Sequence, residues 1–293
     1  MGRTLGTKFN VHFTKVKVMA QPLPQHLLEE YDLVEVAAAW EEAVNNLETE
    51  DDTPVDNLFS AKQQTLLKRA LYSSWTPPAS EEHPEEKRKF LADANVGVFA
   101  SPYQPPVVPD VFLSLDVEPH QDWYAKNHRS YFIWEFKKAP DVVVEIVSNR
   151  KGGELSEKLR RYAEIDVTYY IVYDPAHFLS EDDLRVYERG FGKQYRLRKD
   201  RQLPEVGLSL TLWQGEFEGH TDTWLRWCDA AGNVIPTGEE RAVRAEARVT
   251  ETEAQAHREA TARQEAEARA AQAEAELARL REEVERLKLK ASG

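Results

Sequence analysis

The segment PDVVVEIVS, residues 140–148, carries the strongest strand pattern in the sequence. Its residues 142–147 are aliphatic except for Glu145, which is typical of a central strand buried on both faces of a sheet. An amphipathic stretch follows at Glu154–Ile165, and a second apolar strand pattern comes next at Thr168–Tyr173. This order of strand, helix and strand predicts an α/β sheet.

Further short segments rich in Val, Ile, Tyr and Phe predict more strands of this sheet. They lie at Val96–Ala100, Val107–Val117 and Tyr131–Phe136, and a hairpin joins Leu184–Glu188 to Lys193–Arg198. The N-terminal third predicts two helices, around Leu27–Leu47 and Leu58–Tyr72, and an exposed loop at Thr76–Lys89, which is rich in proline and charge.

The composition narrows the class of protein. The 293 residues carry a net charge of −13, whereas a protein that coats nucleic acid without specificity is usually basic. An enzyme that meets DNA through one local basic face is compatible with this charge. Because no apolar run could span a bilayer and residues 1–20 lack the apolar core of a secretory signal, we expect a cytoplasmic protein with no membrane partner. The single cysteine, Cys228, excludes an internal disulfide and a cysteine-clustered zinc site.

The composition changes near residue 238. Residues 239–290 contain 14 alanines and no glycine or proline, which predicts one long helix, and Thr237 and Glu240 have the spacing of a capping box at its start. A seam with alternating four- and three-residue spacing is typical of a coiled coil; it consists of Ala266, Ala270, Ala273, Leu277, Leu280, Val284 and Leu287. We expect this helix to join copies of the chain in a homo-oligomer; a lone helix stabilised by charge pairs is the alternative.

Two acidic residues interrupt apolar strands in the middle of the chain. Glu145 lies inside the predicted central strand, and Asp110 lies inside the strand predicted at Val107–Val117. A buried carboxylate loses several kcal/mol of hydration unless it is paired, hydrogen-bonded or metal-bound. A strand-end glutamate beside a basic residue would also satisfy this requirement. If the two strands are neighbours, however, the two acids favour a cation between them, and oxygen ligands suit Mg²⁺ better than zinc.

Two other charged residues, Asp141 and Lys158, lie close to Glu145 in the sequence. Asp141 lies four residues before Glu145, about 13 Å along an extended strand, so the two cannot ligate one ion directly and Asp141 is expected at the strand entrance. Lys158 falls at the edge of the buried stripe of the helix Glu154–Ile165, where it can lean over the sheet. A lysine that only covers the edge of the core is the alternative.

These residues carry a resemblance to a known family. Pro109-Asp110, then PDVVVEIVS, then EKLRRYAEIDVTYYIVYDP resembles the Uma family of restriction-endonuclease-like proteins, in the PD-(D/E)XK nuclease superfamily. The similarity covers roughly residues 56–239. It implies a restriction-endonuclease-like mixed sheet flanked by helices, and Mg²⁺-dependent cleavage of DNA phosphodiester bonds, with Mn²⁺ as a substitute metal.

The resemblance also assigns roles to three residues. Asp110 matches the Asp of the PD element and Glu145 matches the acidic residue of (D/E)XK, so both are the implied metal ligands and catalytic carboxylates. The lysine expected two positions later is Val147, which departs from the superfamily pattern. Lys158 on the following helix resembles the family's substitute for that catalytic lysine.

The sequence thus predicts three parts and leaves two functions open. Residues 1–55 form an accessory helical segment, residues 56–238 the restriction-endonuclease-like domain, and residues 239–293 the coiled-coil helix. The leading hypothesis is a metal-dependent DNA endonuclease. The alternative is a non-catalytic scaffold or regulatory protein with a nuclease fold, which acts through its coiled-coil tail. A sequence-specific DNA-binding protein has little support, because no zinc-finger, RNA-recognition or clear helix-turn-helix pattern is present.

Overall fold

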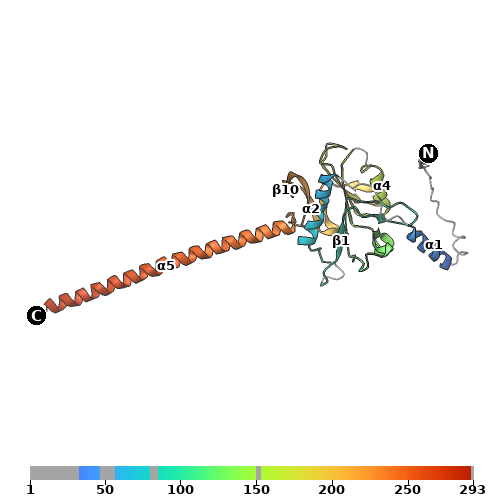
Figure 1. The fold of residues 1–293 in the computed structure, drawn as a ribbon. Helices are drawn as coiled ribbons and strands as arrows, with labels where there is room; N and C mark the ends of the chain where they lie inside the picture. The colour runs from blue at the N-terminus through green and yellow to red at the C-terminus, as the bar shows by residue number, and fades with distance from the viewer. Residues whose placement is uncertain (1–32, 47–56, 80–84, 150–152, 292–293) are drawn as a thin grey trace, which may run out of the picture. The chain divides into compact units, whose positions relative to one another are not determined.

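The structure is a computed structural model that describes residues 33–46, 57–79, 85–149 and 153–291 (Figure 1). Contacts divide the chain into two compact units, Met1–Glu48 and Thr49–Gly293. In the first unit, helix α1 covers Leu33–Asn45, inside the helix expected at Leu27–Leu47. Residues 27–32 and 47 of that expected helix lie outside the described residues.

The second unit is built on a mixed sheet of six strands, in the order β1-β3-β5-β6-β7-β8. β5 and β6 are parallel, and each of the other neighbouring pairs in this sheet is antiparallel. This is the α/β, restriction-endonuclease-like architecture that the sequence predicts. The strands are β1 (Phe90–Asp93), β3 (Val111–Leu115), β5 (Val142–Ile146), β6 (Tyr169–Tyr173), β7 (Leu184–Arg189) and β8 (Tyr195–Leu197).

The segment 140–148 forms the centre of this sheet as β5, and all five of its strand residues are buried. Helix α4 (Glu157–Glu164) makes the crossover from β5 to the parallel strand β6. A parallel pair needs such a connection, because a tight turn would reverse the chain direction. α4 begins three residues later than expected, after a turn in which the Lys158 amide donates to the carbonyl of Gly153.

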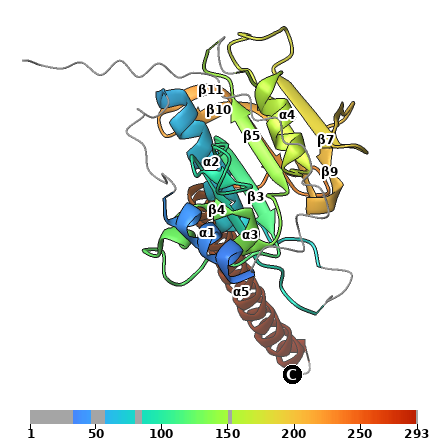
Figure 2. The ribbon, with the colours of Figure 1, turned by 90° about the vertical axis from the view of Figure 1, so that its right-hand side faces the viewer.

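The two faces of β5 pack against different layers (Figure 2). Val142, Val144 and Ile146 join a core with helix α2 (Leu58–Ser74) and with strands β10 (Leu208–Phe217) and β11 (His220–Cys228). The other face of β5, which carries Val143 and Val147, packs under α4. The alternation of side chains along a strand therefore sends Glu145 to the α4 face.

Smaller elements complete the second unit. β9 (Gln202–Leu203) pairs with β10, which pairs with β11 in a three-stranded sheet. β2 (Val98–Phe99) and β4 (Tyr131–Phe132) form a parallel pair. The 3-10 helices η2 and η3 cover Lys126–His128 and Pro204–Val206.

Two expectations about local structure are wrong, and one strand was missed. Residues 133–136 form the short helix α3 (Ile133–Phe136) instead of continuing a strand, and Lys137 ends it in the left-handed conformation, with φ 58°. The strand β1 was not predicted. β3 begins at Val111, so Asp110 lies directly before the strand and not inside it. Asp110 is consequently at a strand end, where its side chain can reach neighbouring backbone.

The tail forms the continuous helix α5 (Gly238–Ala291). The predicted capping box is confirmed: the Glu240 amide donates to Thr237 Oγ1 at 3.2 Å, and the Thr237 amide donates to Glu240 Oε2 at 2.7 Å. Glu240 also pairs with the buried guanidinium of Arg226 at 2.7 Å. This contact ties the first turn of α5 to β11, whereas residues 241–288 are all exposed.

Among the described residues, no helix is both long and apolar enough to cross a membrane.

Candidate active site

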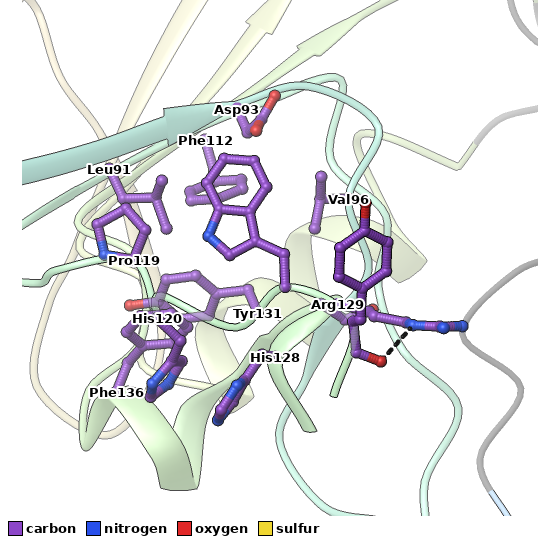
Figure 3. Close-up of a pocket in the computed structure, with 13 residues that line it drawn as sticks. Leu91, Asp93, Val96, Phe112, Pro119, His120, His128, Arg129, Tyr131 and Phe136 are labelled. Carbon is purple, nitrogen blue, oxygen red and sulfur yellow. Dashed lines mark hydrogen bonds between the residues drawn. The ribbon is translucent and has the colours of Figure 1, made fainter. Parts of the chain in front are cut away.

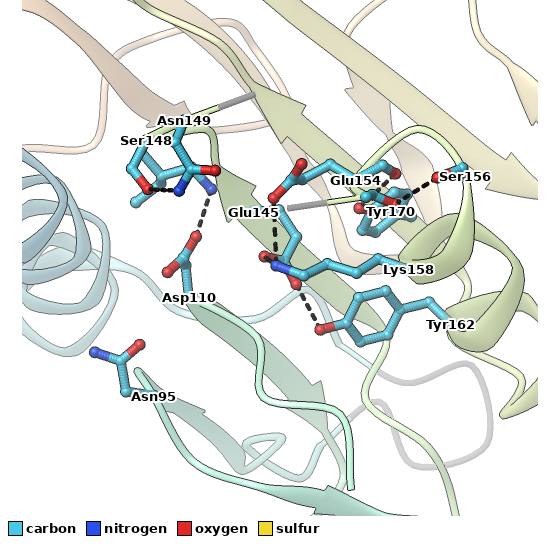
Figure 4. Close-up of polar contacts among 12 residues, drawn as sticks. Asn95, Asp110, Glu145, Ser148, Asn149, Glu154, Ser156, Lys158, Tyr162 and Tyr170 are labelled. Carbon is cyan, nitrogen blue, oxygen red and sulfur yellow. Dashed lines mark hydrogen bonds and ion pairs between the residues drawn. The ribbon is translucent and has the colours of Figure 1, made fainter. Parts of the chain in front are cut away.

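Glu145 is a buried carboxylate in the middle of the sheet, on the face covered by α4 (Figure 4). Its residue surface is only 1% exposed. Oε2 accepts a hydrogen bond from Lys158 Nζ at 2.7 Å, and Oε1 accepts one from the Tyr162 hydroxyl at 2.6 Å. Both donors come from α4, one turn apart. The buried charge of Glu145 is therefore met by a cation and by a hydroxyl group on the same helix.

These contacts set the protonation states of the cluster. Burial raises the pKa of Glu145, although the ion pair with Lys158 and the bond from Tyr162 oppose this rise. Burial alone would lower the pKa of Lys158, but the attraction of Glu145, Glu154 and Asp110 outweighs it and raises that pKa. Burial and the nearby Glu145 raise the pKa of Tyr162 as well. Lys158 is thus a cation at neutral pH and Tyr162 a neutral donor, so Lys158 can stabilise negative charge but cannot act as a base.

Asp110 lies at the start of β3, beside the end of β5. Val111 pairs with Val144 in the antiparallel register, so continuing the register by one residue puts Asp110 opposite Glu145. Its Oδ2 accepts a hydrogen bond from the Ile146 amide at 2.5 Å, and its Oδ1 accepts one from Gln64 Nε2 at 3.1 Å. The structure thereby joins Asp110 to the residue that follows Glu145 in the chain.

Glu154 is a third acid of this cluster that the sequence analysis missed. It precedes α4, is 5% exposed, and places Oε1 3.4 Å from Lys158 Nζ. Its other oxygen, Oε2, is buried and has no hydrogen-bond partner among the described residues. The Glu154 backbone carbonyl accepts a bond from the Tyr170 hydroxyl at 2.9 Å. Because α4 begins only at Glu157, Glu154 lies in the preceding turn, and its four-residue spacing to Lys158 did not by itself predict this contact.

Gln64 of α2 and Asn95 connect Asp110 to the opposite side of the sheet. Asn95 Nδ2 donates to Gln64 Oε1 at 3.0 Å, and Gln64 in turn bonds Asp110. The sequence analysis did not single out Asn95. Ser148 follows β5, and its hydroxyl accepts a hydrogen bond from the side-chain amide of the adjacent Asn149 at 3.3 Å.

Asp141 lies at the entrance of β5, as expected. Its Oδ2 accepts from the Leu115 amide at 2.7 Å and pairs with Lys138 at 2.7 Å. Both contacts tie the beginning of β5 to β3 and to the preceding turn. Arg161 of α4 donates to the backbone carbonyls of Pro105 and Pro106 at 2.7 and 3.0 Å, so its guanidinium is held against the protein. A solvent-facing control on α4 is therefore Arg160, which pairs with Glu164.

The carboxylates of the cluster suit a hard divalent cation. Mg²⁺ binds through one or two protein carboxylates and keeps several waters, so Asp110 and Glu145 are the residues that could hold it. Glu154 Oε2, which has no hydrogen-bond partner in the described part of the chain, is a further buried oxygen acceptor of the cluster. Within the described ranges, no three Asp, Glu, His or Cys side chains are already arranged around one ion position. A cation at Glu145 would also compete with Lys158 for Oε2.

A mixed six-stranded sheet with a β5–α4–β6 crossover is a restriction-endonuclease-like architecture. The chain belongs to the Uma2 family, described as "putative restriction endonuclease", whose family profile matches residues 52–217, more than half of the sequence. The family resemblance read from the sequence is thus confirmed. No curated protein matches the sequence significantly.

Proposed function

We propose that the chain is a Mg²⁺-dependent DNA endonuclease that hydrolyses phosphodiester bonds with Asp110, Glu145 and Lys158. The observation that carries this proposal is the buried Glu145 carboxylate on a central strand, held 2.7 Å from the Lys158 ammonium and adjacent to the Asp110-bound Ile146 amide. A buried acid beside a partly exposed cation is a typical arrangement of functional sites. Membership of the Uma2 family supports the same reaction class.

Each residue has a defined role in this proposal. Asp110 and Glu145 would hold the metal, whose positive charge would polarise the scissile phosphate and lower the pKa of water at the site. Lys158 orients the attacking water and stabilises the charge that develops on the phosphate oxygens. Tyr162 keeps Glu145 in place by its hydrogen bond at 2.6 Å. We assign this chemistry to residues 56–238, with residues 1–55 as an accessory segment.

A metal titration tests this function. The purified protein is incubated with a mixture of supercoiled, linear and branched DNA while Mg²⁺ or Mn²⁺ is raised, and the products are followed on gels. We expect cleavage that depends on the metal, and its loss in Glu145→Gln together with weaker metal binding. Asp141→Asn is the matched control, because it changes an acid of the same segment whose contacts are structural. Absence of cleavage with either metal and every DNA form would contradict the proposal.

A non-catalytic scaffold is the second candidate, and one observation favours it. Both Glu145 oxygens already accept bonds from Lys158 and Tyr162, which is also how a purely structural buried acid is satisfied. In this case Glu145→Gln would leave the biological activity intact, and the function would lie in α5.

We also propose that α5 joins copies of the chain through its C-terminal seam. Leu277, Leu280, Val284 and Leu287 lie at heptad spacing and are all about half exposed. Deleting residues 251–293 should lower the subunit number measured by light scattering. The cut leaves Glu240 in place, because removing it would leave the buried Arg226 guanidinium without its carboxylate partner. Equal subunit numbers for the full-length and shortened chains would refute this assembly.

A further inference from the structure

A cavity of about 420 Å³ lies on the α4-facing side of the sheet, near β1 and β3 (Figure 3). Its walls are rich in rings, and its volume is in the range of small-molecule sites in proteins. The aromatic and imidazole side chains that line it are those of Phe112, Trp123, Tyr124, Tyr131, Phe136, His120 and His128. The three candidate catalytic residues are not among its lining residues.

The floor of the cavity is an unbroken series of ring contacts. Tyr131 lies 5.2 Å from Phe112 and 4.5 Å from Phe136, measured between ring centroids. Phe136 lies 5.4 Å from His120, which stacks on His128 at 3.9 Å. The Tyr131 hydroxyl is fixed by Ser114 Oγ at 2.9 Å. Phe112 and Tyr131 are each 1% exposed and support the floor from beneath, so its accessible surface is formed by the partly exposed rings of Phe136, His120 and His128.

Two further rings at this cavity are exposed. Trp123 is 67% and Tyr124 87% exposed, and neither ring contacts another ring within the described part of the chain. Large aromatic side chains left in water beside a preformed apolar cavity typically mark a binding site. The site has polar groups as well: Asp93 lines the cavity, and its Oδ2 accepts no hydrogen bond from a described residue, while its Oδ1 binds Lys68 at 2.8 Å.

The cavity is close to Asp110 along the chain and through hydrogen bonds. Phe112 lies two residues after Asp110 on the same strand face, about 7 Å along an extended backbone. Asp93 and Val96, which both line the cavity, flank Asn95. The backbone amide of Asn95 donates to the Pro109 carbonyl at 3.2 Å. The Asn95 side chain donates to Gln64, and Gln64 in turn donates to Asp110. A nucleic acid bound at Asp110 would thus present its neighbouring nucleotides to the cavity.

We propose that this cavity receives the base of an unpaired or extruded nucleotide in the DNA substrate. A nucleobase is planar, so it can stack against the partly exposed rings of Phe136, His120 and His128 while Trp123 and Tyr124 cover its other surface. Its amino or imino groups can donate to Asp93 Oδ2. This inference rests on the proposed DNA-cleaving function and narrows its substrate to DNA that contains an unpaired base.

Binding measurements on two matched duplexes test the proposal. The duplexes have one sequence and differ by a single bulged nucleotide, and their binding is followed by fluorescence anisotropy in Ca²⁺. We expect the wild type to bind the bulged duplex about tenfold more tightly than the paired duplex. Trp123→Ala should remove this preference, since stacking of one base on an aromatic ring contributes roughly 5- to 150-fold in affinity, and should leave binding of the paired duplex unchanged.

Phe191→Ala is the control, because Phe191 is also a highly exposed ring but lies in the turn between β7 and β8, outside the cavity lining. It should keep the preference for the bulged duplex. Equal affinity of the wild type for both duplexes, or equal losses in the Trp123 and Phe191 variants, would overturn the proposal.

Deoxyadenosine monophosphate, which contains no internucleotide bond, separates the cavity from the nuclease reaction. Saturation-transfer NMR should show transfer to its base protons with the wild type and loss of this transfer in Trp123→Ala. Transfer without any DNA cleavage would support the cavity and refute the nuclease. Metal-dependent cleavage with neither transfer nor a preference for the bulged duplex would refute the cavity alone.

Discussion

The two faces of strand β5 bury different kinds of side chain, because successive residues of a strand point to opposite faces. Val142, Val144 and Ile146 point into an aliphatic and aromatic core closed by α2, β10 and β11. On the other face, Val143 and Val147 flank Glu145, whose charge is met by Lys158 and Tyr162 of α4. The first face gains stability by removing apolar surface from water. The second face buries a carboxylate, which loses its hydrogen bonds to water. The hydrogen bonds from Lys158 and Tyr162 replace them.

The difference between the two faces predicts which property a substitution on each face will alter. On the aliphatic face, energy is spread over many contacts, so a substitution should alter stability more than chemistry. On the α4 face, a few donors and acceptors set the charge of the cluster, so a substitution should alter chemistry first. Three experiments test this contrast.

The largest expected effect is the loss of stability caused by Leu67→Ala, in the core that packs against Val142, Val144 and Ile146 of β5. Leu67 of α2 is fully buried in that core, so the truncation should lower the free energy of unfolding by about 2–5 kcal/mol. DNA cleavage per folded molecule should stay within about twofold of the wild type. Urea denaturation followed by tryptophan fluorescence gives the stability. Leu58→Ala, at an exposed position of the same helix, should change it by less than about 0.5 kcal/mol.

A large loss of activity in folded Leu67→Ala protein would mean that the two faces are not separable.

The next effect is on chemistry, from Lys158→Ala on the α4 face. Removing the ammonium should slow cleavage by about 10²-fold, close to 2.7 kcal/mol in activation free energy, because one charge-stabilising group is lost. Arg160→Ala removes the same charge two residues away on the same helix, where the side chain is exposed and pairs with Glu164. It should keep nearly full activity in single-turnover cleavage assays. Equal losses in both variants would point to general attraction of DNA and remove Lys158 from the site.

The smallest effect is the pH dependence of stability that Glu145 introduces. Burial raises its pKa above the ordinary value of 4.5. As the pH rises above 4.5, the unfolded chain releases this proton before the folded protein does, so the free energy of unfolding falls, by at most about 1.4 kcal/mol per pH unit. Glu145→Gln cannot titrate and should lack this fall. Urea titrations from pH 4 to pH 8 in chelator measure both proteins, and a wild-type-to-variant difference that is independent of pH would contradict the raised pKa.

Much of the fold was accessible from local patterns. The apolar run at residues 142–147, the helix before Ile165 and the strand at Tyr169–Tyr173 are each encoded by neighbouring residues, and each element is present in the structure. The helix start at Thr237 is a similar case, because a capping box involves only residues three positions apart.

Local patterns failed where a contact distant in the sequence decides the conformation. The segment at residues 131–136 has apolar, β-prone residues, yet only Tyr131–Phe132 pair with a strand, β2, and the chain then turns into α3. Arg161 has the helical position of a solvent-facing residue, but two proline carbonyls some 55 residues earlier accept its hydrogen bonds. No spacing rule on one helix predicts either contact.

The sequence by itself determined the central strand β5, the helix and strand that follow it, the two unusual acids Asp110 and Glu145, and the capped C-terminal helix. Those features depend on hydrophobic periodicity and on hydrogen bonds between near neighbours. Only the tertiary structure decided that Lys158 and Tyr162 meet the same carboxylate, that Glu154 joins them, and that Asp110 binds the amide beside Glu145. These contacts depend on strand register and on the crossover of α4, which bring together residues that are 4–36 positions apart in the chain.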